Sequence, residues 1–369
     1  MVSVAKCVRS LINMTLWAGL TILVILVLVF RFATFHPPEL QRERVYNSQI
    51  VPMLKPGQKI KLLSWNVQFM AGKNYVFWFD MLDLNGPDER PSKEDITKTI
   101  EAVARVIREE NPDIVLLQEI AHGHAVTDHE DQLTRLRSLL PDAYCYTSAF
   151  YVKAAYMPHP RVRGSAGIKL AILSKYKIAT ALRHQLPLTP YDPITQLFSP
   201  KRAILEARLP IKGGGEFVLL TTHLDALAQG TDTLARQVGQ VNNLLNGLTQ
   251  SRIHWIIGGD FNLLPPDEAA YHRLSKSQKA YYDPKPDIAP LYATHQAVSS
   301  LLEVNGQDHD KWFTHFPNDL APAKLDKTLD YFFFADTIQI QDHHVRQGDT
   351  QTISDHMPLI AEFQLPPDG

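Results

Sequence analysis

The first feature of the chain is an apolar run near its amino terminus. Residues 11–30 read LINMTLWAGLTILVILVLVF, without a charged side chain. As a helix that rises about 1.5 Å per residue, this run spans roughly 30 Å, the hydrocarbon thickness of a bilayer. A cleaved signal peptide has a shorter apolar core and a small-x-small cleavage pattern after it, and neither is present here. We therefore predict an uncleaved transmembrane anchor over residues 11–30, between a short tail (residues 1–10) and a linker (residues 31–57).

Beyond the linker, short apolar runs alternate with amphipathic helices, which is the pattern of an α/β domain. Within Asp95–Glu110, apolar residues recur at helical spacing, and Ser92 with Asp95 fits a capping box at the start of this helix. A similar apolar stripe runs through Thr231–Leu248. We predict one α/β domain over residues 58–367.

Polar residues capable of catalysis stand where the apolar runs of this domain begin or end. In layered α/β folds the carboxyl edges of neighbouring strands meet, and ligands commonly bind there. One polar residue at a strand end is ordinary, whereas polar residues at six successive runs predict a functional site. The residues concerned are Asn66, Glu119, His223, Asp260 with Asn262, Asp330, and Asp355 with His356.

These residue types suit hydrolysis of a phosphoester. A carboxylate such as Glu119 is a hard oxygen ligand of the kind that binds Mg²⁺, and a bound metal ion neutralises phosphate charge as a Lewis acid. Asp330 and His356 can form an oriented acid–base pair. In such a pair the carboxylate fixes the imidazole tautomer and the imidazole takes a proton from water.

Three further residues can act on the same phosphoryl group. Asp260 and Asn262 are two positions apart, so on a strand their side chains point to one face. The carboxylate can orient the nucleophilic water while the amide donates to a phosphoryl oxygen. His223 can donate to that oxygen and stabilise the pentacovalent transition state.

Six short motifs together resemble the signature of the endonuclease/exonuclease/phosphatase superfamily. This group includes DNase-I-like nucleases, apurinic endonucleases, inositol polyphosphate phosphatases and neutral sphingomyelinases. The resemblance implies a four-layer α/β sandwich, in which two mixed β-sheets pack face to face with helices outside. The motifs are Ser64-Trp65-Asn66-Val67, Leu117-Gln118-Glu119, Thr222-His223-Leu224-Asp225, Gly258-Gly259-Asp260-Phe261-Asn262, Leu329-Asp330-Tyr331 and Ser354-Asp355-His356-Met357-Pro358.

The resemblance also implies roles for individual residues. Glu119 is expected to be the main ligand of a divalent metal ion, Mg²⁺ or Mn²⁺, with Asn66 and Asp355 nearby. Arg202 is a candidate substrate contact. The base that activates the water stays open between two residues, Asp260 and His356.

Composition narrows the choice of substrate. The formal net charge of −2 combines a leader, residues 1–50, at +3 with a body at −5. A body of that charge offers no evident electrostatic footprint for duplex DNA. The Trp-Cys-Asp-Arg signature of the phosphatase type is missing, which argues against inositol polyphosphates. Because an anchored enzyme meets substrates in two dimensions, we expect a lipid or lipid-linked phosphodiester.

The body is also similar to the superfamily domain attached to eukaryotic proteins of GPI-anchor lipid remodelling, so the expected activity is sphingomyelinase-like or GPI-lipid-related. One alternative is a nuclease that acts on DNA or RNA. Another is a catalytically silent binding domain, although none of the motifs is broken. No protein partner is inferred. A short amino-terminal tail usually stays inside, so we expect a single-pass membrane protein with its catalytic domain on the non-cytoplasmic side.

Two sets of side chains allow two interpretations each. The aromatic residues within Phe69–Arg90 and Tyr144–Tyr156 either pack over the sheet edge or face lipid and a hydrophobic substrate. His122, His124 and His129 could form a second metal site, but we interpret them as residues of a loop.

Overall fold

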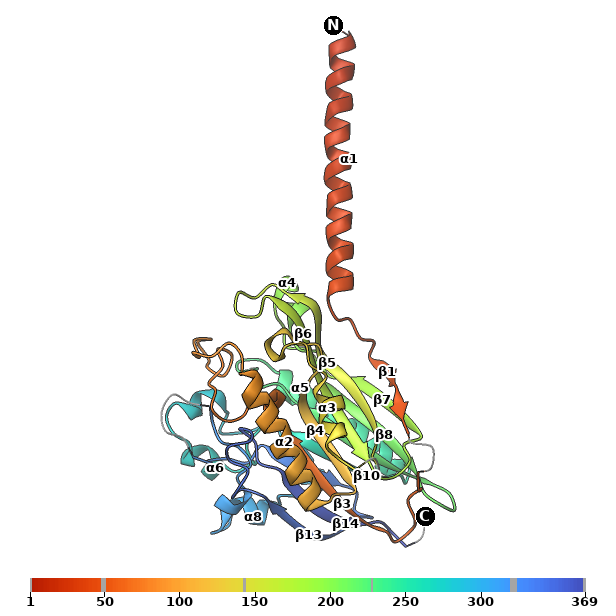
Figure 1. The fold of residues 1–369 in the computed structure, drawn as a ribbon, viewed down its shortest axis with the longest axis vertical. Coiled ribbons are helices and arrows are strands. Elements are labelled where there is room, and N and C mark those ends of the chain that lie inside the picture. The colour runs from red at the N-terminus through yellow and green to blue at the C-terminus, as the bar shows by residue number, and fades with distance from the viewer. Residues whose placement is uncertain (1, 48–50, 142–143, 227, 319–323, 368–369) are drawn as a thin grey trace.

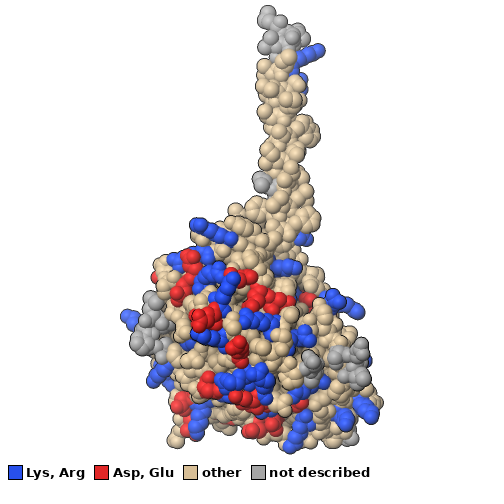
Figure 2. Space-filling view, viewed as in Figure 1, with Lys and Arg blue, Asp and Glu red and all other residues tan. Residues whose placement is uncertain are grey.

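The computed structural model describes residues 2–47, 51–141, 144–226, 228–318 and 324–367. One long helix, α1 (Val2–Ala33), projects from a layered α/β domain (Figure 1). Its segment Lys6–Ala33 is long and apolar enough to cross a membrane and is not buried against the domain. In Figure 2 the projecting helix is almost free of charged side chains, whereas the domain below it carries Lys, Arg, Asp and Glu. Length and composition are the support for a membrane span, and a signal sequence shares both.

The helix is longer than the predicted anchor. Residues 2–10, expected as a tail, belong to the helix, and residue 1 lies outside the described part. This correction has a simple cause, since no glycine or proline interrupts these residues and Lys and Arg are good helix formers. The helix ends at Ala33, shortly before Pro37 and Pro38, which cannot continue it.

Two seven-stranded mixed sheets form the body of the domain. The first has the strand order β13-β14-β3-β4-β6-β5-β2, and the second has the order β1-β7-β8-β9-β10-β12-β11. The first sheet consists of β2 (Val45–Tyr46), β3 (Lys59–Asn66), β4 (Ile114–Ala121), β5 (Cys145–Met157), β6 (Gly164–Ser174), β13 (Gln339–Val345) and β14 (Leu359–Gln364). The second consists of β1 (Leu40–Glu43), β7 (Thr180–Gln185), β8 (Ala203–Pro210), β9 (Glu216–His223), β10 (His254–Asp260), β11 (Gln296–Val298) and β12 (Asp330–Phe334).

Apolar side chains of both sheets fill the space between them, as Leu62, Ile172 and Phe332 do. The outer face of the first sheet packs against α2 (Lys93–Glu110) and α3 (Gln132–Ser138). The outer face of the second packs against α5 (Thr233–Gln250) and α7 (Ala289–Thr294). These layers confirm the predicted four-layer α/β sandwich. The remaining short helices are α4 (Pro193–Phe198), α6 (Glu268–Arg273) and α8 (Leu301–Asn305).

Helix α2 begins close to the residue that the sequence predicts. Ser92 is its N-cap, and the Ser92 hydroxyl accepts a hydrogen bond from the backbone N–H of Asp95 at 3.0 Å. The reciprocal half of the predicted capping box is absent, because the Ser92 backbone N–H donates to the Tyr75 hydroxyl at 2.8 Å. The second predicted helix is α5, which begins two residues later than expected.

The predicted linker is part of the domain rather than a free tether. Its residues form β1 on the edge of the second sheet and β2 on the edge of the first. Strand β1 pairs antiparallel with β7, and β2 pairs antiparallel with β5. Residues 48–50 of the predicted linker lie outside the described part.

The strand directions bring the predicted site residues to one edge. Strands β3 and β4 are parallel, with Asn66 paired to Gln118 next to Glu119. Strands β9 and β10 are parallel as well, and β12 is antiparallel to β10. Asp260 therefore lies between His223 on one neighbouring strand and Asp330 on the other. Since the sheets pack face to face, both groups of strand ends meet at the same end of the sandwich.

Candidate active site

Asn66 joins the two sheets at the centre of the site. Its side-chain amide donates to Glu119 Oε1 at 3.1 Å and to Asp260 Oδ2 at 3.0 Å. Its carbonyl oxygen Oδ1 accepts from the backbone N–H of Gln68 at 3.0 Å, which fixes the orientation of the amide. One side chain thus holds two carboxylates from different sheets within hydrogen-bonding distance of a shared donor.

Glu119 reaches this position because β4 is irregular there. The pairing of β4 with β6 shifts register between Leu117 and Ile120, and Glu119 adopts a positive φ of 59°. A bulge of this kind turns a side chain away from the regular alternation of the strand. A positive φ is uncommon for a residue other than glycine and is found often at functional sites. The local distortion directs the Glu119 carboxylate toward the site.

A histidine between two aspartates forms the second part of the site. His356 Nδ1 lies 2.7 Å from Asp330 Oδ2, and His356 Nε2 lies 3.4 Å from Asp260 Oδ2. All three side chains are almost fully buried. The loop that carries His356 is fixed by Ser354, whose hydroxyl donates to the backbone carbonyl of Asn66 at 2.8 Å.

The charges of these groups influence one another strongly. Burial opposes the charged form of His356, but Asp330 and Asp260 outweigh it and raise the pKa of His356 to about 10. Burial raises the pKa of Asp260 to about 6, although His356 acts against this shift. Burial and the nearby Asp355 raise the pKa of Glu119 to about 7. A bound cation would act against the upward shifts in the pKa of Glu119 and Asp260.

His223 lies between Glu119 and Asp260. Its Nδ1 is 3.7 Å from Glu119 Oε1, and its Nε2 is 3.5 Å from Asp260 Oδ2. Burial, then the positive charges of Arg202 and His356, hold the pKa of His223 well below its usual value. The imidazole is therefore neutral, and it can donate a proton from only one of its two nitrogens. The Tyr151 hydroxyl lies 3.4 Å from Nδ1.

Arg202 is a buried cation beside this group. Its Nε donates to Asp225 Oδ1 at 3.3 Å, and its guanidinium lies over the Tyr151 ring at 5.0 Å. Its Nη1 is buried and has no hydrogen-bond partner among the described residues. A buried unpaired donor is costly unless a ligand pairs with it, and guanidinium suits phosphate oxygens. This geometry fits the predicted substrate contact.

Asn262 is close to the site, but its side-chain amide hydrogen-bonds to a backbone carbonyl of another loop. Its backbone N–H donates to Asp260 Oδ1 at 2.9 Å, and its amide donates to the backbone carbonyl of Leu224 at 3.0 Å. Its φ of 52° marks a sharp left-handed turn after β10. In this arrangement Asn262 positions Asp260 and joins two loops of the site.

The second predicted carboxylate ligand, Asp355, borders Glu119 from the loop after β13. Asp355 Oδ2 accepts from the Asn318 amide at 2.8 Å, and Oδ1 lies 3.2 Å from the Ser354 hydroxyl oxygen. Asp355 raises the pKa of Glu119, as expected for two carboxylates whose charges oppose each other. Hard oxygen donors with excess negative charge fit a divalent cation such as Mg²⁺ or Mn²⁺.

Among the described residues, two groups of His and Asp side chains have ligand atoms within 4.8 Å of one another, and neither group includes Glu119. One is Asp260, Asp330 and His356, and the other adds His315 to Asp355 and His356. The loop histidines 122, 124 and 129 form no such group in the described part of the chain, and His122 instead pairs with Asp131 at 3.2 Å.

The sequence did not point to several residues of the site. The His315 ring packs edge-on against His356 at 4.7 Å. The Lys73 amino group donates to Asn318 Oδ1 at 2.7 Å, and Asn318 in turn binds Asp355. Tyr151 stands in the middle of β5, where an aromatic residue is ordinary core. None of these residues follows a strand end or a motif, so no local signal marks them.

Comparison with known proteins agrees with this geometry. The sequence profile of the Endonuclease/Exonuclease/phosphatase family matches residues 63–356. The chain belongs to this family. A protein of the family from Beutenbergia cavernae DSM 12333 superposes with a TM-score of 0.57 at 19% identity, covering 84% of this chain and 72% of its own. The human Nocturnin catalytic domain superposes with a TM-score of 0.50 at 18% identity, covering 89% of this chain and 99% of its own. At these identities the likeness is one of fold, and no curated protein matches the sequence.

Membership of this family explains why all six motifs occur together in one chain. Family members are generally phosphoester hydrolases that use divalent metal ions, and two His/Asp groups, Asp260–Asp330–His356 and His315–Asp355–His356, are consistent with that chemistry. The matched range begins in β3 and ends at His356 within the last motif, so it includes strands of both sheets.

Proposed function

We propose that this chain is a membrane-tethered, divalent-metal-dependent phosphodiesterase. The observation that carries the proposal is one continuous set of contacts, which runs from Asp330 through His356 and Asp260 to Asn66 and Glu119. It combines an oriented imidazole with paired carboxylates, the groups that activated-water attack on phosphorus requires.

The side chains divide the work of the reaction. Arg202 and His223 bind the phosphoryl oxygens and stabilise the charge that develops on them. Asp330 orients the His356 ring through Nδ1 and stabilises its charged form, and the Asp260–His356 pair takes the proton of the attacking water. Glu119 and Asp355, with Asn66 beside them, would hold Mg²⁺ or Mn²⁺, which supplies Lewis-acid neutralisation of the phosphate.

We propose a lipid or lipid-linked phosphodiester as the substrate. The apolar helix α1 supports this choice because it would confine the domain to a membrane surface. The body, at a net charge of −5, gives no electrostatic reason to prefer nucleic acid. We further propose that the protein is single-pass and that its catalytic domain lies on the non-cytoplasmic side.

The test uses the full-length protein in detergent with bis-p-nitrophenyl phosphate, sphingomyelin and DNA as substrates. We expect hydrolysis that EDTA abolishes and that Mg²⁺ or Mn²⁺ restores. Glu119→Gln, Asp260→Asn and His356→Ala should each lower kcat by about 100-fold or more. Asp342→Asn is the matched control, since Asp342 is exposed on strand β13.

Three results would count against this proposal. Activity that survives both EDTA and His356→Ala would refute the mechanism, and absence of hydrolysis on every substrate would favour a silent binding domain. Hydrolysis of DNA without hydrolysis of lipid would show that the enzyme is a nuclease.

A further inference from the structure

Exposed apolar side chains gather on three segments of the domain. Among the described residues outside α1, eleven large hydrophobic side chains are exposed, and six of them stand on these segments. Three lie in the loop between β3 and α2, one at the end of β5, and two in or just before α4. We call this set the apolar rim: Phe79, Leu82, Leu84, Tyr156, Tyr191 and Ile194.

The three segments lie at the same end of the sandwich as the catalytic cluster. The first follows β3, which ends at Asn66. The second joins β5 to β6 beside the end of β4, and β4 carries Glu119. The third joins β7 to β8, where Ile204 pairs with Thr222 next to His223. The apolar rim therefore surrounds the entrance side of the site.

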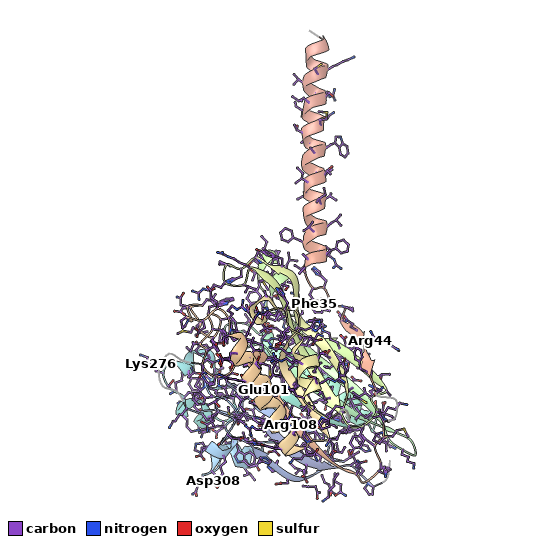
Figure 3. All side chains as sticks on the ribbon, viewed as in Figure 1. Phe35, Arg44, Glu101, Arg108, Lys276 and Asp308 are labelled. Atoms are coloured by element: carbon purple, nitrogen blue, oxygen red, sulfur yellow. The ribbon has the colours of Figure 1, made fainter. Side chains whose placement is uncertain are left out.

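Helix α1 also leaves the domain at this end. Thr34, the residue after the helix, pairs with Ala154 near the end of β5. The Phe30 ring contacts the Phe198 ring of α4 edge-on, with centroids 6.5 Å apart. Figure 1 shows α4 beside the base of α1, and Figure 3 shows Phe35 where the chain enters the domain. These contacts connect the apolar helix directly to the domain. A membrane crossed by α1 would therefore lie against the apolar rim.

Direct contacts hold the rim segments together and connect them to the site. The Trp78 ring stacks on His159 at 4.0 Å between centroids, and Arg161 donates to the backbone carbonyl of Gly86 at 2.7 Å. On the third segment the Thr189 hydroxyl donates to Asp225 Oδ2 at 3.3 Å. Asp225 in turn pairs with Arg202, the proposed phosphate contact. These contacts join the first two rim segments to each other and connect the third to the site.

The charge of the rim differs between its segments: exposed Asp83 and Asp192 stand beside the apolar side chains of two of them, whereas the β5–β6 segment is basic. The β5–β6 hairpin, residues 145–174, contains no Asp or Glu, and it carries Lys153, Arg161 and Arg163 on the part nearest its turn. Basic side chains next to exposed aromatic and aliphatic ones are typical of surfaces that sit in the membrane interface. Anionic lipid headgroups would pair with the basic side chains, while the aromatic and aliphatic side chains enter the boundary between headgroups and acyl chains.

We propose that the apolar rim docks into the interface of the same bilayer that α1 crosses, so that the active site takes its phosphodiester from the plane of that membrane. This proposal rests on the membrane tether of the proposed function. It adds a specific orientation, in which the apolar rim faces the lipid and α8, which lies far from α1 (Figure 1), faces away from it. Soluble phosphodiesters would then reach the site less directly than lipids of the same leaflet.

The orientation can be measured without any catalysis. The full-length protein with Cys7→Ser and Ile194→Cys is labelled with a nitrobenzoxadiazole fluorophore and reconstituted into phosphatidylcholine/phosphatidylserine vesicles. Cys145 is fully buried and leaves the introduced thiol as the target. The control carries Leu302→Cys on α8, which is 87% exposed at the far end of the domain (Figure 1). We expect brominated lipids to quench the label at 194 and not the label at 302. Equal quenching at both positions, or none at 194, would overturn the docking proposal.

A second experiment links the rim to turnover. Ile194→Asp combined with Leu82→Asp should lower hydrolysis of vesicle sphingomyelin by about tenfold, since a lost apolar contact weakens interfacial binding. The same variant should hydrolyse bis-p-nitrophenyl phosphate at the wild-type rate, and Leu302→Asp should change neither rate. An equal loss on both substrates would overturn the proposal. Quenching at 194 in an enzyme that hydrolyses no lipid would support docking and would refute the lipid substrate.

Discussion

At the scale of single residues, the site depends on local backbone distortions as much as on side-chain chemistry. Glu119 and Asn262 both have positive φ angles, and each directs a functional group that a regular strand would point elsewhere. Such conformations cost about 1–3 kcal/mol each and persist only where the surroundings fix them. The hydrogen bonds of Asn66 supply that restraint for Glu119.

The position of Asp330 gives a specific prediction. Its carboxylate contacts His356 Nδ1 at 2.7 Å and raises the pKa of His356, so Asp330→Asn should remove both the orientation of the ring and the stabilisation of its charged form. We expect kcat to fall by about 100-fold or more with little change in KM. Steady-state kinetics on bis-p-nitrophenyl phosphate measure both. A rise in KM at unchanged kcat would show that Asp330 binds substrate instead.

The sequence predicts the central site residues because each of them occupies the same kind of position in a local sequence pattern. Asn66, Glu119, His223 and Asp260 each stand at the end of an apolar run, and parallel strands bring such ends together. His315 could not be predicted, because it reaches the site through a loop that has no periodic pattern in the sequence. The hydrogen bond of the Asn262 amide could not be predicted either, because its partner is a backbone carbonyl of another loop.

At the scale of elements, the two edge strands β1 and β2 are the main feature that the sequence does not predict. They are four and two residues long, and β1 reads Leu-Gln-Arg-Glu, so neither has enough alternation to indicate a strand. They form because both sheets offer an unpaired edge beside the point where α1 ends. Their pairing turns a predicted tether into a firm attachment of the helix to the domain.

Strand β1 carries a half-buried acid that should make stability depend on pH. Burial raises the pKa of Glu43 to about 7, with Arg183 and Lys169 acting against this shift. An acid whose pKa is raised on folding stabilises the protein at low pH, and that contribution is lost as the pH rises through about 7. Glu43→Gln should therefore stabilise the domain at pH 8 relative to wild type, by roughly 1–2 kcal/mol, and have little effect at pH 4.5.

Denaturant unfolding of the detergent-solubilised protein at the two pH values measures this difference. Glu39→Gln is the matched control, because Glu39 is exposed just before β1. A stabilisation by Glu43→Gln that is the same at both pH values would show that ionisation of this carboxyl does not matter.

At the scale of the whole molecule, the apolar helix and the catalytic end of the sandwich are on one side. The sequence predicts both parts separately, but their relation depends on the pairing of Thr34 with Ala154 and on the packing of Phe30 against Phe198. These contacts are between residues more than 100 positions apart, which no local pattern indicates. The arrangement places the candidate site on the same side of the domain as the apolar helix.

Native cysteines allow the direction of the anchor to be tested. Cys7 is exposed near the amino end of α1, whereas Cys145 is fully buried in β5. If the amino terminus stays inside, a membrane-impermeant maleimide should label the protein only after the cells are permeabilised, and Cys7→Ser should remove the label. External protease should meanwhile digest the catalytic domain in intact cells. Labelling of Cys7 in intact cells, with the domain protected from protease, would establish the opposite orientation and place the substrate in the cytoplasmic leaflet.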